Sequence, residues 1–288
     1  MEISGKTGLT ALIGSPVSHS ISPKIQNLSF EALGIDCVYL ALDIKEEDLG
    51  KAVEGLRSIG IWGFNVTLPY KEKVVEWMDD LTDAARLIGA CNTVIVKDGR
   101  MIGHTTDGAG FMRSVSDLGC DVIGKKISIL GAGGAAKSII AQAAIDGVSA
   151  IDIFQRKPSP RFSETVALAE KIQTSTGCRI RVCEFADSAQ MRQSFSESVL
   201  LINATNLGMA PHEDTCPLDD ASLLRPELYV CDIIYNPRTT RLLKMAQDAG
   251  CRTANGLGML LFTGAASFQC WTGKEMPVDL IRDRIFSS

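Results

Sequence analysis

The chain has 288 residues, of which 45% are hydrophobic, and a formal net charge of −5 at pH 7. This length allows one large domain or two smaller ones, and the acidic balance argues against nucleic acid as a partner. No apolar run is long enough to cross a membrane, the first residues lack the apolar segment of a signal peptide, and the nine scattered cysteines are typical of thiols in a reducing cytoplasm.

Strand and helix signals alternate along the chain, which predicts an α/β fold with parallel sheets. In the first part, strands are expected over 9–13, 37–42 and 63–67, and two short strands around the Asp98-Gly99 turn over 92–96 and 101–105. Helices are expected from the cap Ser22 and Pro23 to Gly34, over 48–59, and from Pro69 onward.

A second series of alternating strands and helices begins at Lys126. Its strands are expected over 126–130, 150–154, 179–185, 199–204 and 229–233. Helices are expected near 135–145, 162–174 and 189–196, and two more over 258–272 and 278–286.

A glycine-rich turn, Gly131-Ala132-Gly133-Gly134-Ala135-Ala136, follows the strand at 126–130. Gly131 allows a tight turn, Gly133 lets the backbone approach a phosphate, and Ala136 lets helix and strand pack closely. A dinucleotide pyrophosphate would then lie on the N-terminus of the next helix. A plain strand–helix turn is the alternative, and the surrounding strand and helix favour the dinucleotide site.

Together these patterns predict two domains with a cleft between them. The N-terminal domain is an open α/β domain of residues 1–108, to which 257–288 return. The other is a Rossmann-type dinucleotide-binding domain of residues 109–256. No metal site is expected, because the three histidines lie far from any cysteine pair.

Polar clusters stand where the strands of the first domain end, the position at which open α/β sheets bind ligands. Ser20 and Ser22 would hold a carboxylate or hydroxyl, or would serve only as loop and capping residues. Lys71 is expected in the first turn of the helix that Pro69 opens. The helix dipole disfavours a cation there, and a lysine that transfers a proton needs a charged form that is disfavoured in this way. The alternative is a solvated surface lysine.

Two further polar residues, Asn92 and Asp107, stand at element boundaries. Asp107 would cap the following helix, or would accept a hydrogen bond from Lys71 or from a substrate hydroxyl.

In this order the clusters resemble the shikimate/quinate dehydrogenase family over essentially the whole chain, and they are most similar to its quinate/shikimate branch. Seven stretches in order are far more specific than any one of them. They are Ser18-His19-Ser20-x-Ser22-Pro23, Asn65-Val66-Thr67-x-Pro69-x-Lys71, Gly89-Ala90-x-Asn92-Thr93, Thr106-Asp107-Gly108-x-Gly110, Gly131-Ala132-Gly133-Gly134-Ala135, Asn203-Ala204-Thr205 and Gly256-Leu257-Gly258-Met259-Leu260.

The resemblance implies a cytoplasmic NAD(P)-dependent oxidoreductase of aromatic amino acid biosynthesis, a monomer or homodimer. It would interconvert shikimate, quinate or a close cyclohexene or cyclohexane carboxylate and its 3-dehydro ketone by hydride transfer, with Lys71 moving the proton and Asp107 orienting it. Implied substrate contacts are Ser20, Ser22, Thr67, Asn92, Tyr235 and Thr263. Implied cofactor contacts are Gly131, Ala132, Gly133, Gly134, Ala135, Gln155, Arg156, Lys157, Asn203, Ala204, Thr205, Gly256 and Met259.

Thr263 departs from the family, which usually has a glutamine there that reaches a substrate hydroxyl. Threonine is shorter and cannot offer an amide donor and acceptor together. A modified substrate such as an amino-shikimate is therefore an alternative to shikimate and quinate. A non-catalytic ligand sensor is a further alternative, against which the intact Lys71 and Asp107 argue.

The signal for the adenosine ribose is mixed. Asp152 has about the spacing of the acid that marks NAD, but it is expected inside a strand rather than at its end. Gln155, Arg156, Lys157 and Pro158 follow at the strand end. Arg156 and Lys157 would hold a 2′-phosphate, or Arg156 would stack on the adenine, so NADP and NAD both stay open.

Overall fold

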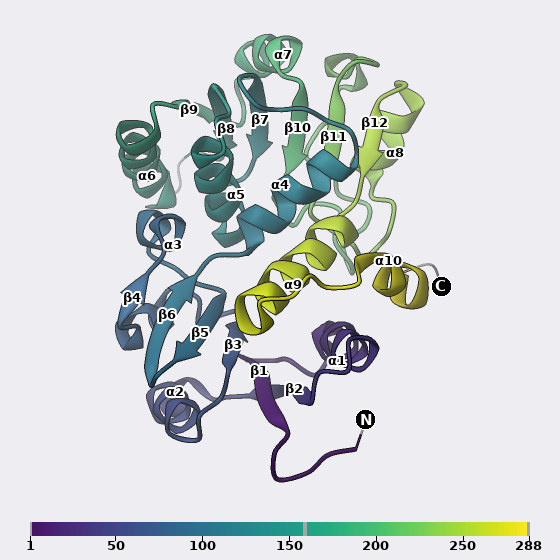
Figure 1. Ribbon diagram of the computed structural model, residues 1–288. Coiled ribbons are helices and arrows are strands. Elements are labelled where there is room, and N and C mark those ends of the chain that lie inside the picture. The colour runs from purple at the N-terminus through teal and green to yellow at the C-terminus, as the bar shows by residue number, and fades with distance from the viewer. Residues whose placement is uncertain (1, 158–159, 287–288) are drawn as a thin grey trace. The chain divides into compact units, whose positions relative to one another are not determined.

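The computed structural model describes residues 2–157 and 160–286. The chain divides into two compact units, Met1–Gly110 with Leu261–Ser288, and Phe111–Leu260. Each unit holds one six-stranded sheet, so the predicted α/β class is confirmed (Figure 1). Among the helices described, none is both long and apolar enough to cross a membrane.

The first unit contains the N-terminal strands and helices and the C-terminal helices. Its strands are β1 (Gly8–Gly14), β2 (Cys37–Asp43), β3 (Gly63–Val66), β4 (Asp80–Leu81), β5 (Thr93–Lys97) and β6 (Arg100–His104). Its helices are α1 (Ser22–Ala32), α2 (Leu49–Ser58), α3 (Asp83–Ile88) and α10 (Val278–Ile281), with 3₁₀ turns at Glu46–Asp48 and Lys73–Trp77 and a π-helical turn at Arg282–Phe286. The chain passes between the units within α4 (Asp107–Asp117) and α9 (Leu257–Thr272).

The sheet of the first unit is mixed, so the expectation of parallel sheets is wrong here. Its strand order is β2-β1-β3-β5-β6-β4, and β5 runs antiparallel to both β3 and β6. Strands β5 and β6 are antiparallel because of the tight turn between them, where Asp98 and Gly99 both have positive φ angles, of 54° and 74°. Two such residues give the hairpin turn that reverses the chain directly.

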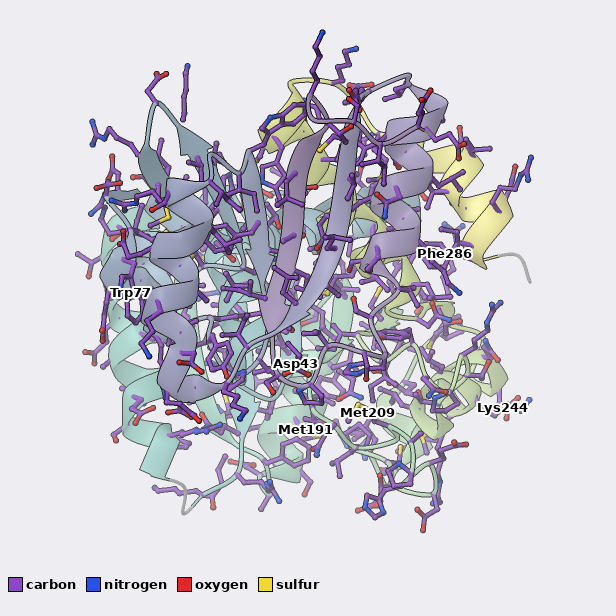
Figure 2. All side chains as sticks on the ribbon, turned by 90° about the horizontal axis from the view of Figure 1, so that it is seen from below. Asp43, Trp77, Met191, Met209, Lys244 and Phe286 are labelled. Carbon is purple, nitrogen blue, oxygen red and sulfur yellow. The ribbon has the colours of Figure 1, made fainter. Side chains whose placement is uncertain are left out.

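Side chains alternate across β1 and fill a hydrophobic cluster on each face of this sheet. Ala11 and Ile13 join Val53 of α2 on one face, with Trp77 at the edge of that cluster (Figure 2). Leu12 points to the other face, where Phe30 of α1 packs on Phe268 of α9 with ring centroids 5.1 Å apart. The C-terminal helices therefore complete the core of the N-terminal sheet.

The helix expected from Pro69 onward does not form there. Thr67 to Tyr70 make a turn that closes when the Tyr70 N–H donates to the Thr67 carbonyl, and the next helical turn is the 3₁₀ turn at Lys73–Trp77. Pro69 is thus a turn residue rather than the first residue of a helix. Lys71 lies two residues before this 3₁₀ turn and outside any helix, so the helix-dipole argument for that lysine is wrong.

The second unit has an all-parallel sheet of order β12-β11-β10-β7-β8-β9, with helices between the strands, as the Rossmann prediction requires. Its strands are β7 (Lys126–Leu130), β8 (Ala150–Gln155), β9 (Arg179–Glu184), β10 (Leu200–Asn203), β11 (Tyr229–Asp232) and β12 (Arg252–Ala254). Its helices are α5 (Gly134–Ile145), α6 (Pro160–Thr176), α7 (Ser188–Glu197) and α8 (Arg241–Asp248), with a 3₁₀ turn at Ala221–Leu223. The sequence interpretation missed the short elements α3, β4, α8 and β12.

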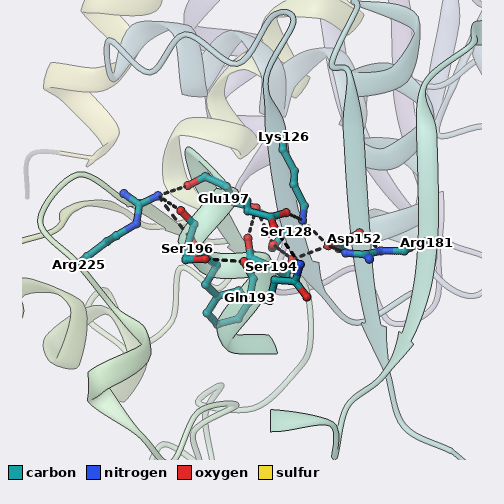
Figure 3. Close-up of polar contacts among 11 residues, drawn as sticks. Lys126, Ser128, Asp152, Arg181, Gln193, Ser194, Ser196, Glu197 and Arg225 are labelled. Carbon is teal, nitrogen blue, oxygen red and sulfur yellow. Dashed lines mark hydrogen bonds and ion pairs between the residues drawn. The ribbon is translucent and has the colours of Figure 1, made fainter. Parts of the chain in front are cut away.

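Asp152 lies inside β8, as expected, in a buried network of charges and hydroxyls (Figure 3). Lys126 Nζ lies 2.7 Å from its Oδ2, and Arg181 makes two hydrogen bonds to the carboxylate, of 2.9 and 2.6 Å. Ser194 Oγ donates to Oδ2 at 2.7 Å. Burial alone would raise the pKa of Asp152, but the hydrogen bonds from Arg181, Lys126 and Ser194 outweigh it and lower the pKa to about 2.

We expect Asp152→Asn to lower the free energy of unfolding at pH 7 by about 2 kcal/mol, because it removes the buried carboxylate with which Lys126 and Arg181 pair, while Lys126 keeps Glu197 and Arg181 is 44% exposed. A carboxyl whose pKa is depressed in the folded state stabilises the fold above its unfolded pKa. The wild-type chain should therefore lose this contribution as the pH falls from about 4 toward 2. Denaturant titrations at several pH values measure both effects.

The control is Asp146→Asn, which removes an exposed carboxylate of the same unit. It should leave the wild-type pH dependence between 4 and 2 in place. An Asp152→Asn chain as stable as the Asp146→Asn chain at pH 7 would contradict the prediction.

Candidate active site

Lys71 and Asp107 meet in the first unit, with Lys71 Nζ 2.7 Å from Asp107 Oδ2. Lys71 lies in the turn after β3, and Asp107 is the first residue of α4, directly after β6. Their side chains are 25% and 11% exposed, so the pair is shielded from bulk water but not sealed from a ligand. A charge-assisted hydrogen bond of this length fixes the position of the ammonium group.

Asn92 holds the second oxygen of the Asp107 carboxylate. Its buried Nδ2 donates to Asp107 Oδ1 at 2.9 Å and to Thr106 Oγ1 at 3.0 Å. Its Oδ1 accepts the Thr106 N–H at 2.7 Å. Both ends of the amide are therefore engaged, and each oxygen of Asp107 has its own donor.

Behind this group lies a set of hydroxyls that the sequence interpretation did not single out. Thr93 Oγ1 lies 2.8 Å from Thr106 Oγ1 and 2.9 Å from Ser267 Oγ. Asn65 Nδ2 donates to the Thr93 and Ser267 hydroxyls, each at 2.9 Å. We call Asn65, Thr93, Thr106 and Ser267 the hydroxyl cluster. The first three stand inside the matching stretches of the sequence, whereas no motif pointed to Ser267.

The buried Tyr39 completes the cluster from β2, since its hydroxyl donates to Asn65 Oδ1 at 2.8 Å. Burial strongly raises the pKa of Tyr39, and a hydrogen bond with Ser22 opposes this effect only in part. The phenol therefore stays protonated and acts as a donor.

The two serines stand at the start of α1, both partly buried. Ser20 Oγ accepts the Ser22 N–H at 3.3 Å, and Ser22 is the first helical residue, not the cap that was expected. Ile21 occupies the cap position, where no side chain caps the helix. Thr67 is also partly buried and follows β3. It packs against Gly14, because a Cβ added at Gly14 would lie only 2.3 Å from Thr67 Cγ2.

Thr263 lies on α9 against α4 of the same unit. A Cβ at Gly110 would stand 2.4 Å from both the backbone nitrogen and Oγ1 of Thr263, so only glycine allows this contact. Thr263 Oγ1 is buried and has no hydrogen-bond partner among the described residues. The hydroxyl thus lies against Gly110 of α4 and makes no hydrogen bond within the described part of the chain.

The second unit contains a pocket of about 590 Å³ at the carboxyl ends of β7, β8 and β10. Gly131 has a φ of +97°, and a Cβ there would lie 2.9 Å from the Ala204 carbonyl. A Cβ at Gly133 would meet nothing within 4 Å, so the space above this turn is open. Gly133 is also the N-cap of α5, which no side chain caps, and this geometry fits a dinucleotide phosphate.

Cations and an amide gather on the side of this pocket where β8 ends. Gln155, Arg156, Lys157 and Arg161 line it, and none of the described lining residues is acidic. Gln155 Oε1 is buried and without a partner in the described part of the chain. Pro158, which the sequence analysis also considered, lies outside the described residues.

Other residues implied as cofactor or substrate contacts occupy different places in the second unit. Ala132, Ala204 and Thr205 line the pocket, whereas Gly134 and Ala135 begin α5. Asn203 shapes the next loop, because its Oδ1 accepts the Thr205 N–H at 3.0 Å. Tyr235 is 42% exposed. Gly256 packs directly on the Ile233 carbonyl, and Met259 lies on α9.

Two family models match the chain. Residues 12–94 match the shikimate dehydrogenase substrate binding domain, and residues 256–286 match the shikimate 5′-dehydrogenase C-terminal domain.

Full-length relatives and solved structures agree with these matches. The chain is 46% identical over 284 residues to shikimate dehydrogenase (NADP(+)) of Listeria innocua serovar 6a. This alignment covers 99% of the present chain and 97% of the Listeria protein. The crystal structure of shikimate 5-dehydrogenase from Listeria monocytogenes in complex with shikimate and NAD has a TM-score of 0.96 and 46% identity, with 98% of each chain covered. A shikimate dehydrogenase in complex with NADP+ has a TM-score of 0.89 and 36% identity, covering 99% of this chain and 97% of that one.

Proposed function

Because the chain belongs to the shikimate dehydrogenase family, we propose that it interconverts shikimate and 3-dehydroshikimate with a nicotinamide dinucleotide. The observation that carries the proposal is the Lys71–Asp107 pair, in which both carboxylate oxygens are held and the lysine side chain stays partly exposed. A protein that only bound the ligand would have no need of such a pair.

Lys71 and Asp107 divide the acid–base work of this reaction. When bound, the nicotinamide accepts or donates the hydride. In the direction of ketone reduction, Lys71 Nζ donates a proton to the oxygen on which charge develops, and in the reverse direction Nζ takes the proton of the hydroxyl. Asp107 keeps Nζ in place through the 2.7 Å contact, so little reorganisation is needed during the reaction.

Four side chains of the first unit are proposed to bind the substrate. Ser20 and Ser22 stand at the N-terminus of α1, where hydroxyls and backbone N–H groups suit a carboxylate. Thr67 and Asn92, which flank the loop that carries Lys71, are proposed to contact ring hydroxyls. Tyr235 is proposed to border the pocket on the family resemblance alone.

We propose that the cofactor is held at the Gly131–Ala135 turn, and that NADP is preferred over NAD. Arg156, Lys157 and Arg161 give the adenosine side of the pocket a positive charge that suits a 2′-phosphate. Asp152, which has the spacing of a ribose-binding acid, is already paired with Lys126 and Arg181. A relative that carries NADP(+) in its name and another crystallised with NAD are consistent with use of both cofactors.

The protein is further proposed to be a cytoplasmic enzyme of aromatic amino acid biosynthesis. All nine cysteines are free thiols, seven of them buried, as in a reducing compartment. That the protein is a monomer or a homodimer stays a prediction.

The first test removes the lysine. Lys71→Met should lower kcat with shikimate by roughly 10²- to 10⁴-fold, with a smaller change in KM, because it deletes the proton-transfer group but keeps much of the side-chain volume. Steady-state rates of cofactor reduction measure this.

Lys73→Met is the matched control, since Lys73 lies two residues away and pairs with Glu46 at the surface. It should keep nearly wild-type rates. Wild-type protein that fails to oxidise shikimate would overturn the function, and an active Lys71→Met variant would overturn the role of the lysine.

The second test concerns the cofactor. The double variant Arg156→Ala/Lys157→Ala should lower kcat/KM for NADP by roughly 10²- to 10⁴-fold, because each of the two charge-assisted hydrogen bonds to a phosphate contributes about 1.5–3 kcal/mol and about 1.4 kcal/mol corresponds to tenfold. The value for NAD should change far less. Arg179→Ala, an exposed cation on β9 outside the pocket, is the control. Equal losses with both cofactors would contradict the preference.

The third test concerns the substrate. Thr263→Gln should raise kcat/KM for shikimate by about tenfold, because the longer amide offers a donor and an acceptor that threonine cannot offer together. A panel of shikimate, quinate and amino-shikimate measures the effect in both chains. If the wild-type chain prefers amino-shikimate and the glutamine lowers that activity, the pocket is adapted to the modified substrate instead.

A further inference from the structure

Ser267 lies on α9 at the centre of the hydroxyl cluster and is fully buried. Its Oγ lies 2.9 Å from Thr93 Oγ1 and 3.2 Å from Thr106 Oγ1, and it accepts a hydrogen bond from Asn65 Nδ2. It also lies 3.1 Å from the Thr263 carbonyl of its own helix. A buried serine that only satisfied its own hydroxyl would need this last contact alone.

Two neighbours of Ser267 are the residues that hold Asn92. Thr106 bonds both ends of the Asn92 amide, through its N–H at 2.7 Å and its hydroxyl at 3.0 Å. Asn65 Nδ2 donates to the Asn92 main-chain carbonyl at 3.1 Å. Ser267 is thus separated from Asn92 by a single intervening residue along two routes, one through Thr106 and one through Asn65.

Proton counting shows why the hydroxyl of Ser267 matters. Tyr39 donates to Asn65 Oδ1, which turns the Asn65 NH₂ group toward the cluster. That group has two hydrogens for three acceptors, namely Thr93 Oγ1, Ser267 Oγ and the Asn92 carbonyl. With Ser267 Oγ present, the two hydrogens are shared among the three acceptors and the amide takes an intermediate orientation. Without Ser267 Oγ, both hydrogens turn to Thr93 Oγ1 and the Asn92 carbonyl, and Thr106 loses one hydroxyl neighbour. Because Asn65 and Thr106 both hold Asn92, this change of orientation would shift Asn92.

We propose that Ser267 is a positioning residue for the reaction, acting through Asn65 and Thr106 on Asn92, and through Asn92 on Asp107. This inference rests on the proposed function, because the orientation of Asp107 matters only if Lys71 and Asp107 transfer the proton. Helix α9 thus contributes, through Ser267, to the alignment of the Lys71–Asp107 pair.

The test compares Ser267→Ala with Ser29→Ala. Ser29 is also fully buried in the first unit, and its hydroxyl also donates to the carbonyl four residues earlier in its own helix, at 2.8 Å. Ser267→Ala should lower kcat with shikimate by roughly 10- to 100-fold, more than it raises KM, as small misplacements of reacting groups do. Ser29→Ala should keep wild-type kcat. Equal kcat in the two variants would overturn the proposal.

A double-mutant cycle separates positioning from general loss of structure. If Ser267 acts through Asn92, adding Ser267→Ala to Asn92→Ala should lower kcat little further. Independent, multiplying effects of the two substitutions would overturn the route through Asn92. Ser267→Thr, which keeps the hydroxyl, should retain most of the activity, and thermal unfolding of each variant reports its stability.

If Ser267→Ala does not fold, Thr93→Val takes its place, because it removes the neighbouring hydroxyl at nearly constant volume. It should give the same loss of kcat, and full activity in this variant would overturn the proposal. Failure of the proposed function itself shows differently, as a folded wild-type chain without activity on shikimate.

Discussion

Each oxygen of the Asp107 carboxylate accepts a hydrogen bond from a different segment of the chain, and the arrangement of the first unit depends on this constraint. Lys71 reaches one oxygen from the turn after β3, and Asn92 reaches the other from the start of β5. Asp107 itself follows the end of β6. Three segments must therefore meet at one edge of the sheet, and the strand register shows how they do. Asn65, Thr93 and His104 face one another across β3, β5 and β6 in a single row.

The antiparallel direction of β5 is what makes this meeting possible. In a parallel sheet the start of a strand lies at the edge opposite to the ends of its neighbours, so Asn92 would stand far from Lys71 and Asp107. The connection from β3 to β5 returns to the end of β3, so that β5 starts there, and the Asp98-Gly99 turn then reverses the chain and brings the end of β6 beside the start of β5. The mixed sheet is thus a requirement of the site and not only a variation of the fold.

The strongly patterned parts of the fold were predictable from the sequence. The apolar run of β7, the glycine turn after it and the Asp-Gly hairpin depend on local chemistry, and the structure has all three. Pro69 was misassigned because proline suits both a first helical position and a turn, and the choice depends on contacts beyond the local sequence. Ser267 could not be found at all, since its partners Asn65 and Thr93 are more than 170 residues away in the sequence. The short helix α8 was missed although Thr240 caps it, through a hydrogen bond that its hydroxyl accepts from the Leu243 N–H.

Strand β8 carries a carboxylate that is neutralised inside the strand, and cations gather where the strand ends. Asp152 and Gln155 are three residues apart, which corresponds to about 10 Å along an extended strand. At Asp152, Lys126 and Arg181 surround the carboxylate and compensate its charge. At Gln155 the strand ends in the pocket, where the neighbouring charges are those of Arg156 and Lys157. A negative phosphate at this end would therefore meet cations nearby and a carboxylate whose field is already cancelled, so the spacing of an acid along the sequence does not by itself decide which cofactor a Rossmann unit binds.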